Sequence, residues 1–384
     1  MQVIALENEP STGRSGQERC LLNICRGLAA RNHAISLLYR RRGNFLEEYQ
    51  TFCQSLIPVH MYRLEVKNNL ASLQSFIADL LKVPMDKTSL VYCNQYHDSF
   101  FGMALSRLSG VPLICHLHLP PPPQMGWQWT LGMKAVHHMI AVSHHTKMEW
   151  VDRGYPADKI SVVHNGIDTA RFTPTTDRAA LRSQLNLPVH RTLISYVGRL
   201  DPCKGLETLL KAFALVCKQN PSVHLAIAGK PLTSRLSYLS TLKKLVDELA
   251  ISPHITFLGH LDYPEQLYRT SDLTVLPSIW SEPFGLSLIE SMACGVPALG
   301  SRTGGIQEVL TGEFEEALFT PDNREELATV MNRWLDWRDR DPTLGDRCRQ
   351  HTLCNFTQEH MIDNIERILL YVLANLNNLI KIEE

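Results

Sequence analysis

The sequence has no surplus of charge and no closely spaced cysteines, and each absence excludes a class of protein. Its 384 residues contain 38 Lys and Arg against 39 Asp and Glu, a net charge of −1, whereas a nucleic-acid-binding surface usually brings a basic surplus. None of the ten cysteines belongs to a Cys-x-x-Cys pair, so neither a zinc site nor a disulfide framework is indicated. Free thiols suit a reducing compartment. We therefore expect a cytoplasmic protein that binds no nucleic acid and holds no metal.

Long apolar runs are also missing. No stretch of about 18 apolar residues occurs, so no segment is expected to span a membrane. The segment Met1–Glu7 has no basic start and is predicted to be a strand rather than a signal peptide. Peripheral contact with the inner face of a membrane stays open, because Arg40, Arg41 and Arg42 follow a predicted strand and could bind anionic lipid or an acceptor phosphate. A solvated charged surface is the more common meaning of such a run.

Short apolar runs alternate with amphipathic helical patterns along the whole chain, which is typical of β-α units around parallel sheets. The length favours two domains. We predict strands near residues 2–6, 34–39, 58–61, 89–93, 111–116, 138–142 and 160–163 in the first half, and near 192–197, 223–228, 255–258, 272–276 and 297–299 in the second. Residues 165–191 are polar, include Pro174 and Pro188 and lack a strong strand pattern, so we place the domain boundary there.

Two glutamates near residue 290 form the most informative pattern. Glu282 lies at a predicted loop–helix junction, and Glu290 lies eight positions later in the helix, about 12 Å further along its axis. Two such glutamates usually form a solvated surface. Here an apolar run, Leu273–Leu276, precedes them as a buried strand and the helix itself is largely apolar. Glu290 is therefore expected to be partly buried and to need a partner.

The start of that helix is predicted to bind an anion. Pro283 suits a first helical turn, where its missing N–H costs nothing, and Gly285 permits close approach to the backbone. Backbone amides from Phe284 to Leu286 would face an anion. An anion site beside two carboxylates suits a ligand with a hydroxyl-rich ring at each end and phosphates between them, which is the shape of a nucleotide sugar.

Two cations follow the first predicted strand of the second half. Arg199 and Lys204 lie beside Gly198 and Gly205, and the carboxyl end of a parallel strand faces the ligand cleft in open α/β sheets. Cations at that position offset the charge that grows on a departing diphosphate, without a metal. A lone Arg or Lys is usually a surface residue, so the interpretation depends on the pair.

Four segments in this order resemble the retaining glycosyltransferases of family 4, which have the GT-B fold. They are Gly16-Gln17-Glu18, His164–Asp168, Gly198–Gly205, and Glu282 to Glu290 followed by residues 291–297 and Gly304-Gly305. The resemblance implies an α/β protein with two Rossmann-like, doubly wound domains that face a central cleft. It predicts an acceptor-side domain at 1–170, a linker at 171–190, a nucleotide-sugar-binding domain at 191–355 and a final helix at 356–384. That helix returns to the first domain in the family; capping its own domain is the alternative.

The resemblance also implies residue roles. Arg199 and Lys204 would hold the donor diphosphate, Glu290 would accept hydrogen bonds from the ribose, and Glu282 would contact the sugar near its anomeric centre. The family places one histidine in the cleft, and register favours His118, which ends a strand, over His116. A hydrogen-bonded structural histidine is the alternative for both.

Other features of the sequence leave more than one interpretation open. Gly16 ends a polar loop before a helix, so its amide could approach phosphate or acceptor, although the family usually has a glycine pair where this chain has Ser15-Gly16. Trp127 and Trp129 follow a stiff run of prolines and form either an acceptor rim or part of the core. The segment Asp339-Arg340-Asp341 resembles a metal-binding motif of another fold, and we interpret it as surface.

The predicted activity is metal-independent transfer of a sugar, with retention, from a UDP- or GDP-sugar to a hydroxyl of a glycan, a lipid-linked acceptor or a small molecule, in polysaccharide or glycolipid biosynthesis. No cofactor beyond that donor is expected. Two alternatives remain. A sugar-nucleotide epimerase would need further acid–base carboxylates, which no motif supplies. A catalytically inactive sugar-nucleotide-binding protein would be favoured by loss of Glu282, Glu290, Arg199 or Lys204, and all four are present.

Overall fold

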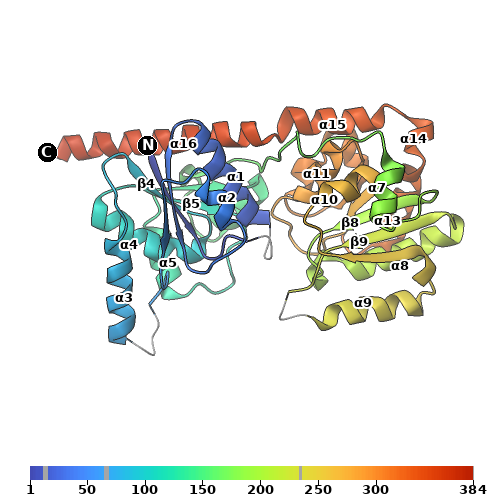
Figure 1. The fold of residues 1–384 in the computed structure, drawn as a ribbon, viewed down its shortest axis with the longest axis horizontal. Helices are drawn as coiled ribbons and strands as arrows, with labels where there is room; N and C mark the ends of the chain where they lie inside the picture. Colours follow the sequence, from blue (N-terminus) through green and yellow to red (C-terminus); the bar gives the residue numbers. More distant parts are fainter. Residues whose placement is uncertain (12–15, 65–68, 233–235, 384) are drawn as a thin grey trace. The chain divides into compact units, whose positions relative to one another are not determined.

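Two wholly parallel sheets organise the chain, each in its own unit (Figure 1). A computed structural model describes residues 1–11, 16–64, 69–232 and 236–383. The first unit comprises Met1–Asn165 and Glu359–Glu384, and the second comprises Gly166–Gln358. The prediction of an α/β protein with two doubly wound parallel sheets is confirmed.

The first sheet has the strand order β3-β2-β1-β4-β5-β6-β7. Its strands are β1 (Gln2–Glu7), β2 (Ala34–Tyr39), β3 (Ser55–Pro58), β4 (Ser89–Cys93), β5 (Leu113–Leu117), β6 (His138–Ala141) and β7 (Ile160–Val162). Apolar residues pack on both faces: Ile4 and Leu6 belong to one core cluster, and Val3 and Ala5 to another. The order reverses between β1 and β4, the point at which open α/β sheets bind their ligands.

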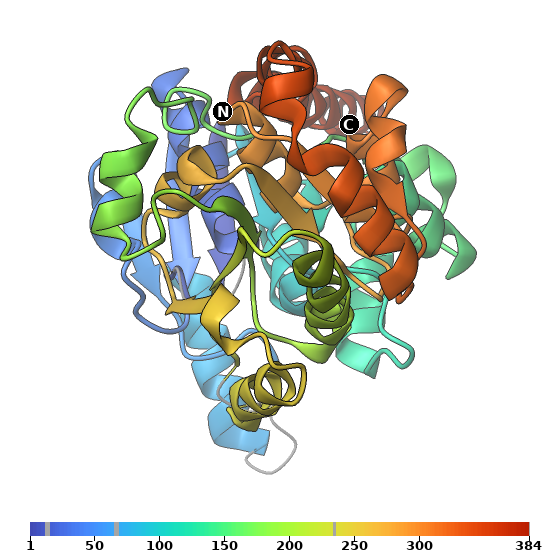
Figure 2. The ribbon, with the colours of Figure 1, turned by 90° about the vertical axis from the view of Figure 1, so that its right-hand side faces the viewer.

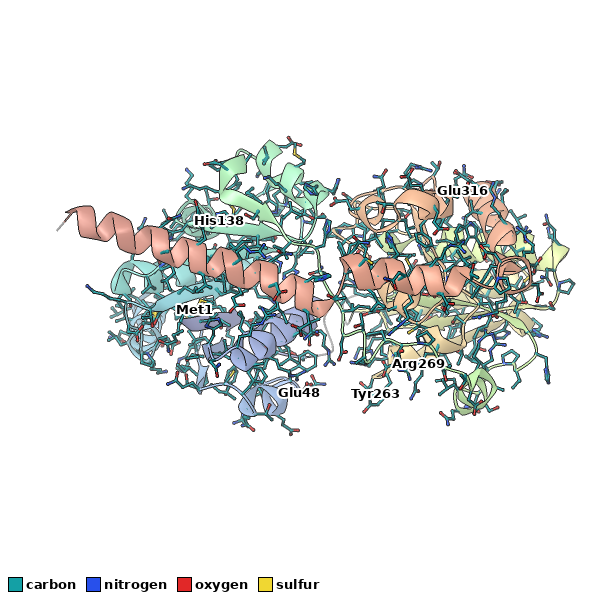
Figure 3. The ribbon with its side chains drawn as sticks, turned by 90° about the horizontal axis from the view of Figure 1, so that it is seen from above. Met1, Glu48, His138, Tyr263, Arg269 and Glu316 are labelled. Carbon is teal, nitrogen blue, oxygen red and sulfur yellow. The ribbon has the colours of Figure 1, made fainter. Side chains whose placement is uncertain are left out.

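Helices cover both faces of this sheet. They are α1 (Gly16–Ala30), α2 (Leu46–Gln50), α3 (Asn69–Leu81), α4 (Ser99–Ser109), α5 (Trp127–Lys134), α6 (His144–Asp152) and, from the end of the chain, α16 (Gln358–Glu383). Figure 3 shows α16 lying across the unit beside α1. Ile362 of α16 packs so closely on Gly27 of α1 that a Cβ at Gly27 would lie 2.2 Å from it. Met361, Ile365 and Leu369 join the same core cluster, so the last helix completes this core.

The second sheet repeats the first topology, with the order β10-β9-β8-β11-β12-β13 (Figure 2). Its strands are β8 (Thr192–Val197), β9 (Val223–Ala228), β10 (Ile255–Gly259), β11 (Leu273–Leu276), β12 (Ala298–Ser301) and β13 (Leu318–Phe319). Its helices are α7 (Arg178–Gln184), α8 (Leu206–Gln219), α9 (Ser237–Glu248), α10 (Pro264–Thr270), α11 (Leu286–Ala293), α12 (Ile306–Val309), α13 (Arg324–Leu335), α14 (Trp337–Arg340) and α15 (Leu344–Asn355). Its reversal point lies between β8 and β11.

Two details of the predicted strands are wrong. The strand predicted near 58–61 is β3, which ends at Pro58. Its residues are only half-buried at the sheet edge, so they show no strong apolar run, whereas the buried Val59 follows the strand. The strand β13 is missing from the prediction, because two residues are too few to form a pattern.

Residues 171–190, predicted as a linker, lie within the second unit and contain α7. Their polar side chains have buried partners. Arg182 is buried and donates from Nη2 to Oδ2 of Asp272 over 2.9 Å, and Arg178 contacts the other carboxylate oxygen. Polar composition therefore reflects an ion-pair network here, and the units meet in sequence at Asn165–Gly166.

The segment Asn165–Asp168 has a structural role at this junction. Ile167 forms a parallel bridge with Thr357, where the chain returns towards the first unit. A Cβ at Gly166 would lie 2.2 Å from the carbonyl oxygen of Thr357, so only glycine fits the close approach of the two segments.

A bilayer-spanning helix does not occur in the described part of the chain, where no helix combines enough length with enough apolar side chains.

Candidate functional site

Two loops meet at the carboxyl end of the second sheet, beside its reversal point. The loop after β8 carries Arg199 and Lys204, and the loop after β11 carries Glu282. Gly205 holds the loops together: its φ is +68°, and a Cβ there would lie 1.9 Å from the carbonyl oxygen of Pro277. Only glycine lets the two backbones approach so closely. This contact brings predicted site residues from both loops together.

Lys204, which is half-buried, and the buried Glu282 form an ion pair. Nζ of Lys204 lies 2.5 Å from Oε2 of Glu282, which also accepts hydrogen bonds from Oγ of Ser278 at 2.8 Å and Nε1 of Trp280 at 3.1 Å. Glu282 is 9% exposed. Burial raises the pKa of its carboxyl, but the Lys204 charge and the three hydrogen bonds outweigh burial and hold that pKa below its ordinary value. Glu282 is therefore ionised at neutral pH.

The glycine pair of the family motif fixes the backbone of Glu282. The amide of Gly305 donates to the carbonyl oxygen of Glu282 over 2.7 Å. Gly304 has a φ of +55°, and a Cβ there would lie 2.1 Å from the same carbonyl oxygen. Any larger residue at Gly304 would have to displace this backbone.

The helix after Glu282 begins later than predicted. Gly285 precedes α11 with a φ of +106°, and the helix runs from Leu286 to Ala293. Pro283 therefore lies outside the first turn, and Glu282 is not on the helix, so the predicted axial separation of about 12 Å from Glu290 does not apply. The left-handed φ of Gly285 ends the preceding loop, a feature that helix-start patterns do not include.

Glu290 is half-buried on α11 and has a partner, as its apolar helix predicts. The hydroxyl of Tyr268, a buried residue of α10, donates to Oε2 of Glu290 over 2.8 Å. Burial, and then the charge of Glu290, raise the pKa of Tyr268 well above its ordinary value. The carboxylate is thus held in one orientation by a neutral donor.

Arg199 lies in the same region as the ion pair. The buried Tyr196 donates from its hydroxyl to the carbonyl oxygen of Arg199 over 2.8 Å. Burial and then the charge of Glu282 raise the pKa of Tyr196, while the Arg199 charge lowers it, so both charges lie near one phenol. Nε of Arg199 is 3.7 Å from Asp201 and has no hydrogen-bond partner among the described residues.

In the first unit, His118 directly follows β5. Its Nε2 lies 3.0 Å from Oδ1 of Asn94, and its ring is tilted by 36° against that of His116, with the centroids 4.0 Å apart. Burial lowers the pKa of His118 to about 3, so it is neutral. His116 is fully buried, and its Nδ1 is hydrogen-bonded to the hydroxyl of Tyr92 at 2.7 Å, which gives it a structural role.

Two residues were not predicted from the sequence: Asn94, which contacts His118, and Glu7, which contacts Asn94. Glu7 ends β1 and Asn94 follows β4, the strands at which the order of the first sheet reverses. Both are buried, and Nδ2 of Asn94 donates to Oε2 of Glu7 over 2.9 Å. Burial, then the nearby charges of Glu18 and Asp98, raise the pKa of Glu7 to about 8. The available signal was a polar residue at the end of each of two adjacent central strands.

The remaining predicted positions lie at surfaces, except Trp129. Gly16 is exposed as the first residue of α1, and the loop residues 12–15 before it lie outside the described residues. Arg40 is exposed and donates from Nε to the carbonyl oxygen of His60 over 3.1 Å. Trp129 packs in the core against Tyr96, with ring centroids 5.6 Å apart, whereas Trp127 is 61% exposed.

Asp341 binds Arg347 at 2.7 Å and Asp339 is exposed. A metal site is not needed to explain either aspartate.

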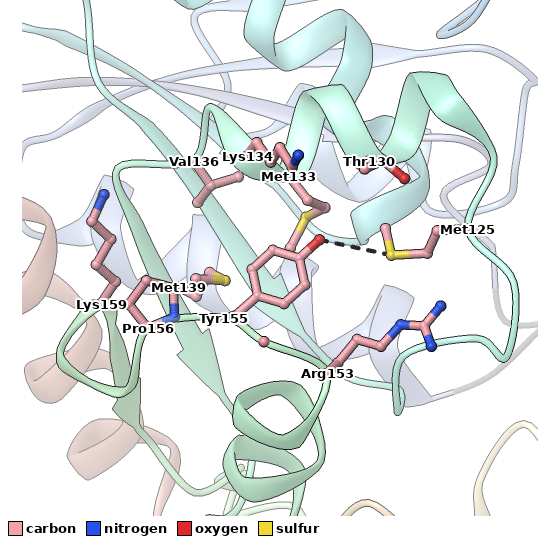
Figure 4. Close-up of a pocket in the computed structure, with 11 residues that line it drawn as sticks. Met125, Thr130, Met133, Lys134, Val136, Met139, Arg153, Tyr155, Pro156 and Lys159 are labelled. Carbon is pink, nitrogen blue, oxygen red and sulfur yellow. Dashed lines mark hydrogen bonds between the residues drawn. The ribbon is translucent and has the colours of Figure 1, made fainter.

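A pocket of about 380 Å³ lies in the first unit (Figure 4). Met125, Met133 and Tyr155 form its apolar wall, and the Tyr155 hydroxyl contacts the sulfur of Met125 at 3.7 Å. None of its lining residues is a predicted site residue. We therefore do not assign the activity to it.

Comparison with known families covers most of the chain. Residues 177–351 match the glycosyl transferases group 1, and residues 14–171 match glycosyltransferase family 4. The D-inositol 3-phosphate glycosyltransferase of Mycolicibacterium smegmatis is 34% identical over 207 residues, which are 53% of this chain and 46% of that protein. The chain therefore spans about half the length of that relative. An uncharacterized glycosyltransferase of Methanocaldococcus jannaschii is 26% identical over 83% of this chain and 85% of its own.

Solved structures share the fold of this chain. The Anabaena protein HepE, solved with UDP and glucose, superimposes with a TM-score of 0.83 at 22% identity, over 96% of this chain and 99% of its own. Sucrose-phosphate synthase of Thermosynechococcus elongatus gives 0.78 at 23% identity, over 98% and 100%. At such identities the likeness shows the fold, which is GT-B.

Proposed function

We propose, because this chain belongs to the glycosyl transferases group 1, that it transfers a sugar from a nucleotide-sugar donor to a hydroxyl acceptor, with retention and without a metal. The observation that carries the proposal is the cluster at the reversal point of the second sheet. There a buried carboxylate, Glu282, is paired with Lys204 and lies near Arg199. Two cations at a strand end suit a leaving diphosphate.

Each site residue has a proposed role in that reaction. Arg199, whose Nε still has donor capacity, binds the diphosphate together with Lys204. Glu290, oriented by Tyr268, accepts hydrogen bonds from the ribose. Glu282 accepts hydrogen bonds from the transferred sugar.

The remaining proposed contacts involve backbone amides and one ring. Amides from Phe284 to Leu286 bind donor phosphate, since Gly285, with its left-handed φ, directly precedes the first turn of α11. His118 contacts a sugar hydroxyl, and Gly16 approaches the acceptor or its phosphate.

The chemistry is a substitution on one face of the sugar. The bond between C1 and the β-phosphate oxygen breaks, and its electron pair leaves with the diphosphate. The acceptor oxygen forms the new bond to C1 on the same face, and its proton passes to a departing phosphate oxygen. No protein nucleophile is needed, and the cations stabilise the charge that develops on the leaving group.

The same comparison supports a choice of donor and acceptor classes to test. HepE binds UDP and UDP-glucose, so we propose a UDP-sugar first and a GDP-sugar as the alternative base. A glycan, a lipid-linked acceptor and a small hydroxyl compound all remain candidate acceptors. A phosphorylated polyol belongs among the first tested, since one relative is named for D-inositol 3-phosphate.

The proposal is tested by a screen of UDP- and GDP-sugars for thermal stabilisation, followed by product analysis with soluble and lipid-linked acceptors. An α-linked product from an α-configured donor is expected, as read by NMR. Conversion of the donor without an acceptor would indicate the epimerase. Stabilisation without turnover for any acceptor would indicate the inactive binding protein.

Replacing Glu290 with alanine should weaken donor binding about tenfold to a hundredfold, because each hydrogen bond to a charged group contributes about 1.5–3 kcal/mol. Isothermal titration of the identified donor measures the change. Glu248→Ala, a change at an exposed glutamate of α9 in the same unit, serves as control. Equal affinities for both variants would refute the assignment of Glu290.

Treatment with EDTA should leave the transfer rate within about twofold of the untreated enzyme, since Arg199 and Lys204 supply the charge that a metal would provide. Initial rates are measured before and after addition of excess Mg²⁺ or Mn²⁺. Loss of activity that either ion restores would contradict the metal-free mechanism.

A further inference from the structure

We infer that Asn94 and Glu7 fix His118 as the neutral tautomer with its hydrogen on Nε2, so that Nδ1 presents a hydrogen-bond acceptor to a hydroxyl of the substrate. Neither residue is part of the motifs from which the activity was predicted. The substrate contact depends on the function proposed above, whereas the tautomer does not. Asn94 and Glu7 are positioning residues in this scheme, because they act through His118.

The orientation of the Asn94 amide follows from its partners. Nδ2 of Asn94 lies 3.2 Å from the carbonyl oxygen of Gln17 and 2.9 Å from Oε2 of Glu7. A backbone carbonyl can only accept a hydrogen bond, so the NH₂ group must face Gln17. The opposite atom, Oδ1, then faces His118.

That orientation determines the histidine tautomer. Oδ1 of Asn94 can only accept, and it lies 3.0 Å from Nε2 of His118, so Nε2 carries the hydrogen. Nδ1 then has a lone pair, and it has no hydrogen-bond partner among the described residues. A neutral acceptor at this position selects a ligand group that can donate, such as a sugar hydroxyl.

Burial makes the alternative arrangement costly. Asn94 and Glu7 are 0% and 1% exposed and His118 is 9% exposed. Reversing the Asn94 amide would place its oxygen against the Gln17 carbonyl and leave buried groups unpaired, at about 1–3 kcal/mol for each group. Glu7 is itself held by the amide of Asn8, which donates to Oε1 over 2.8 Å. Each hydrogen bond in this series therefore has one donor: Asn94 donates to Glu7, and His118 donates to Asn94.

The tautomer should persist over a wide pH range. His118 faces His116 of β5 and Asn94, which follows β4, while the acidic neighbours of Glu7 are Glu18 on α1 and Asp98. Since burial lowers the pKa of His118 to about 3, its ring stays neutral between pH 5 and 9. Ionisation of Glu7 near pH 8 strengthens the acceptor for Asn94 and favours the same tautomer.

The direct test is long-range ¹H–¹⁵N NMR of the full chain labelled at its histidines, with His118 assigned through His118→Gln. The expected spectrum has Nε2 protonated and Nδ1 unprotonated from pH 5 to 9. In Asn94→Leu the His118 signals should move towards a mixture of tautomers, while His116, bound by Tyr92, stays unchanged as an internal control. A protonated Nδ1 in the wild-type protein would overturn the inference.

A second variant distinguishes the proposed role of Asn94 in fixing the His118 tautomer from a merely structural role. Asn94→Asp keeps an acceptor for Nε2 but loses the donor to Gln17 and to Glu7, so Nε2 of His118 should keep its hydrogen. This outcome keeps the test valid if the leucine variant does not fold. Loss of the hydrogen from Nε2 of His118 in Asn94→Asp would contradict the positioning role of Asn94.

Activity tests the consequence for the substrate. Asn94→Leu should lower kcat/KM for transfer about tenfold, the cost of a poorly oriented hydrogen bond. In the His118→Gln background the same change should have no further effect, because residues acting through one contact are not additive. Full additivity would refute the positioning role. Absence of transferase activity in the wild-type protein would refute the proposed function and leave the NMR result intact.

Discussion

Replacing Lys204 with methionine is expected to destabilise the protein by about 3 kcal/mol and to lower the transfer rate about a hundredfold. The substitution keeps the length of the side chain but leaves Glu282 as a buried carboxylate with only neutral donors, Ser278 and Trp280. Urea unfolding measures the stability, and initial rates at saturating donor measure transfer.

A second substitution and a control separate the two effects. In Lys204→Met/Glu282→Gln no buried charge is left unpaired, so stability should largely recover while transfer stays impaired. Lys244→Met, which breaks an exposed pair with Glu248 at 3.6 Å, should cost less than about 0.5 kcal/mol. If Lys204→Met were as stable as Lys244→Met, the ion pair of Lys204 with Glu282 would contribute little to the stability of the protein.

The sign of the pH dependence provides an independent check. In the wild-type protein the pKa of Glu282 is below its ordinary value of 4.5, so its stabilisation is present above pH 4.5 and is lost as the pH falls through the folded pKa. Without Lys204 burial dominates and the pKa rises. The stability deficit of Lys204→Met should therefore shrink on acidification, because a protonated Glu282 needs no cation.

The sequence indicated the central strands of both sheets because their residues are buried on two faces and form apolar runs. The edge strand β3 lacks that burial, and its position was predicted wrongly. The polar residues Arg178 and Arg182 suggested a linker because composition does not reveal Asp272, their partner about ninety positions away. Local pattern thus identifies what a segment buries, but not what it pairs with.

The same distinction applies to the candidate site. Glu282 and Lys204 were each predicted from a motif, but their ion pair joins residues 78 positions apart and depends on the contact of Gly205 with Pro277. Asn94 belongs to no motif at all. It is placed beside Glu7 only because β4 pairs with β1 rather than with β3, which is a property of topology.

Replacing Gly304 with alanine is expected to displace the backbone of Glu282 and to lower the transfer rate. The added Cβ would lie 2.1 Å from the carbonyl oxygen and 2.7 Å from the nitrogen of Glu282, and both are backbone atoms that cannot rotate away. The loop must shift, and a displacement of about 1 Å at a positioned group costs about a hundredfold in rate. We also expect the free energy of unfolding to fall by about 2–4 kcal/mol, because of the left-handed φ and the forced repacking together.

Gly312→Ala is the matched control for this variant, because it separates backbone strain from steric contact. Gly312 has a similar φ, +62° against +55° at Gly304, but a Cβ there would meet nothing within 4 Å. Its replacement should cost only the strain of about 1–2 kcal/mol and leave kcat/KM unchanged. The difference between the two variants in urea unfolding and in kcat/KM is therefore the effect of the contact with Glu282. Equal losses in both would mean that the glycine pair does not position the carboxylate, and that its side-chain contacts with Lys204, Ser278 and Trp280 hold it in place.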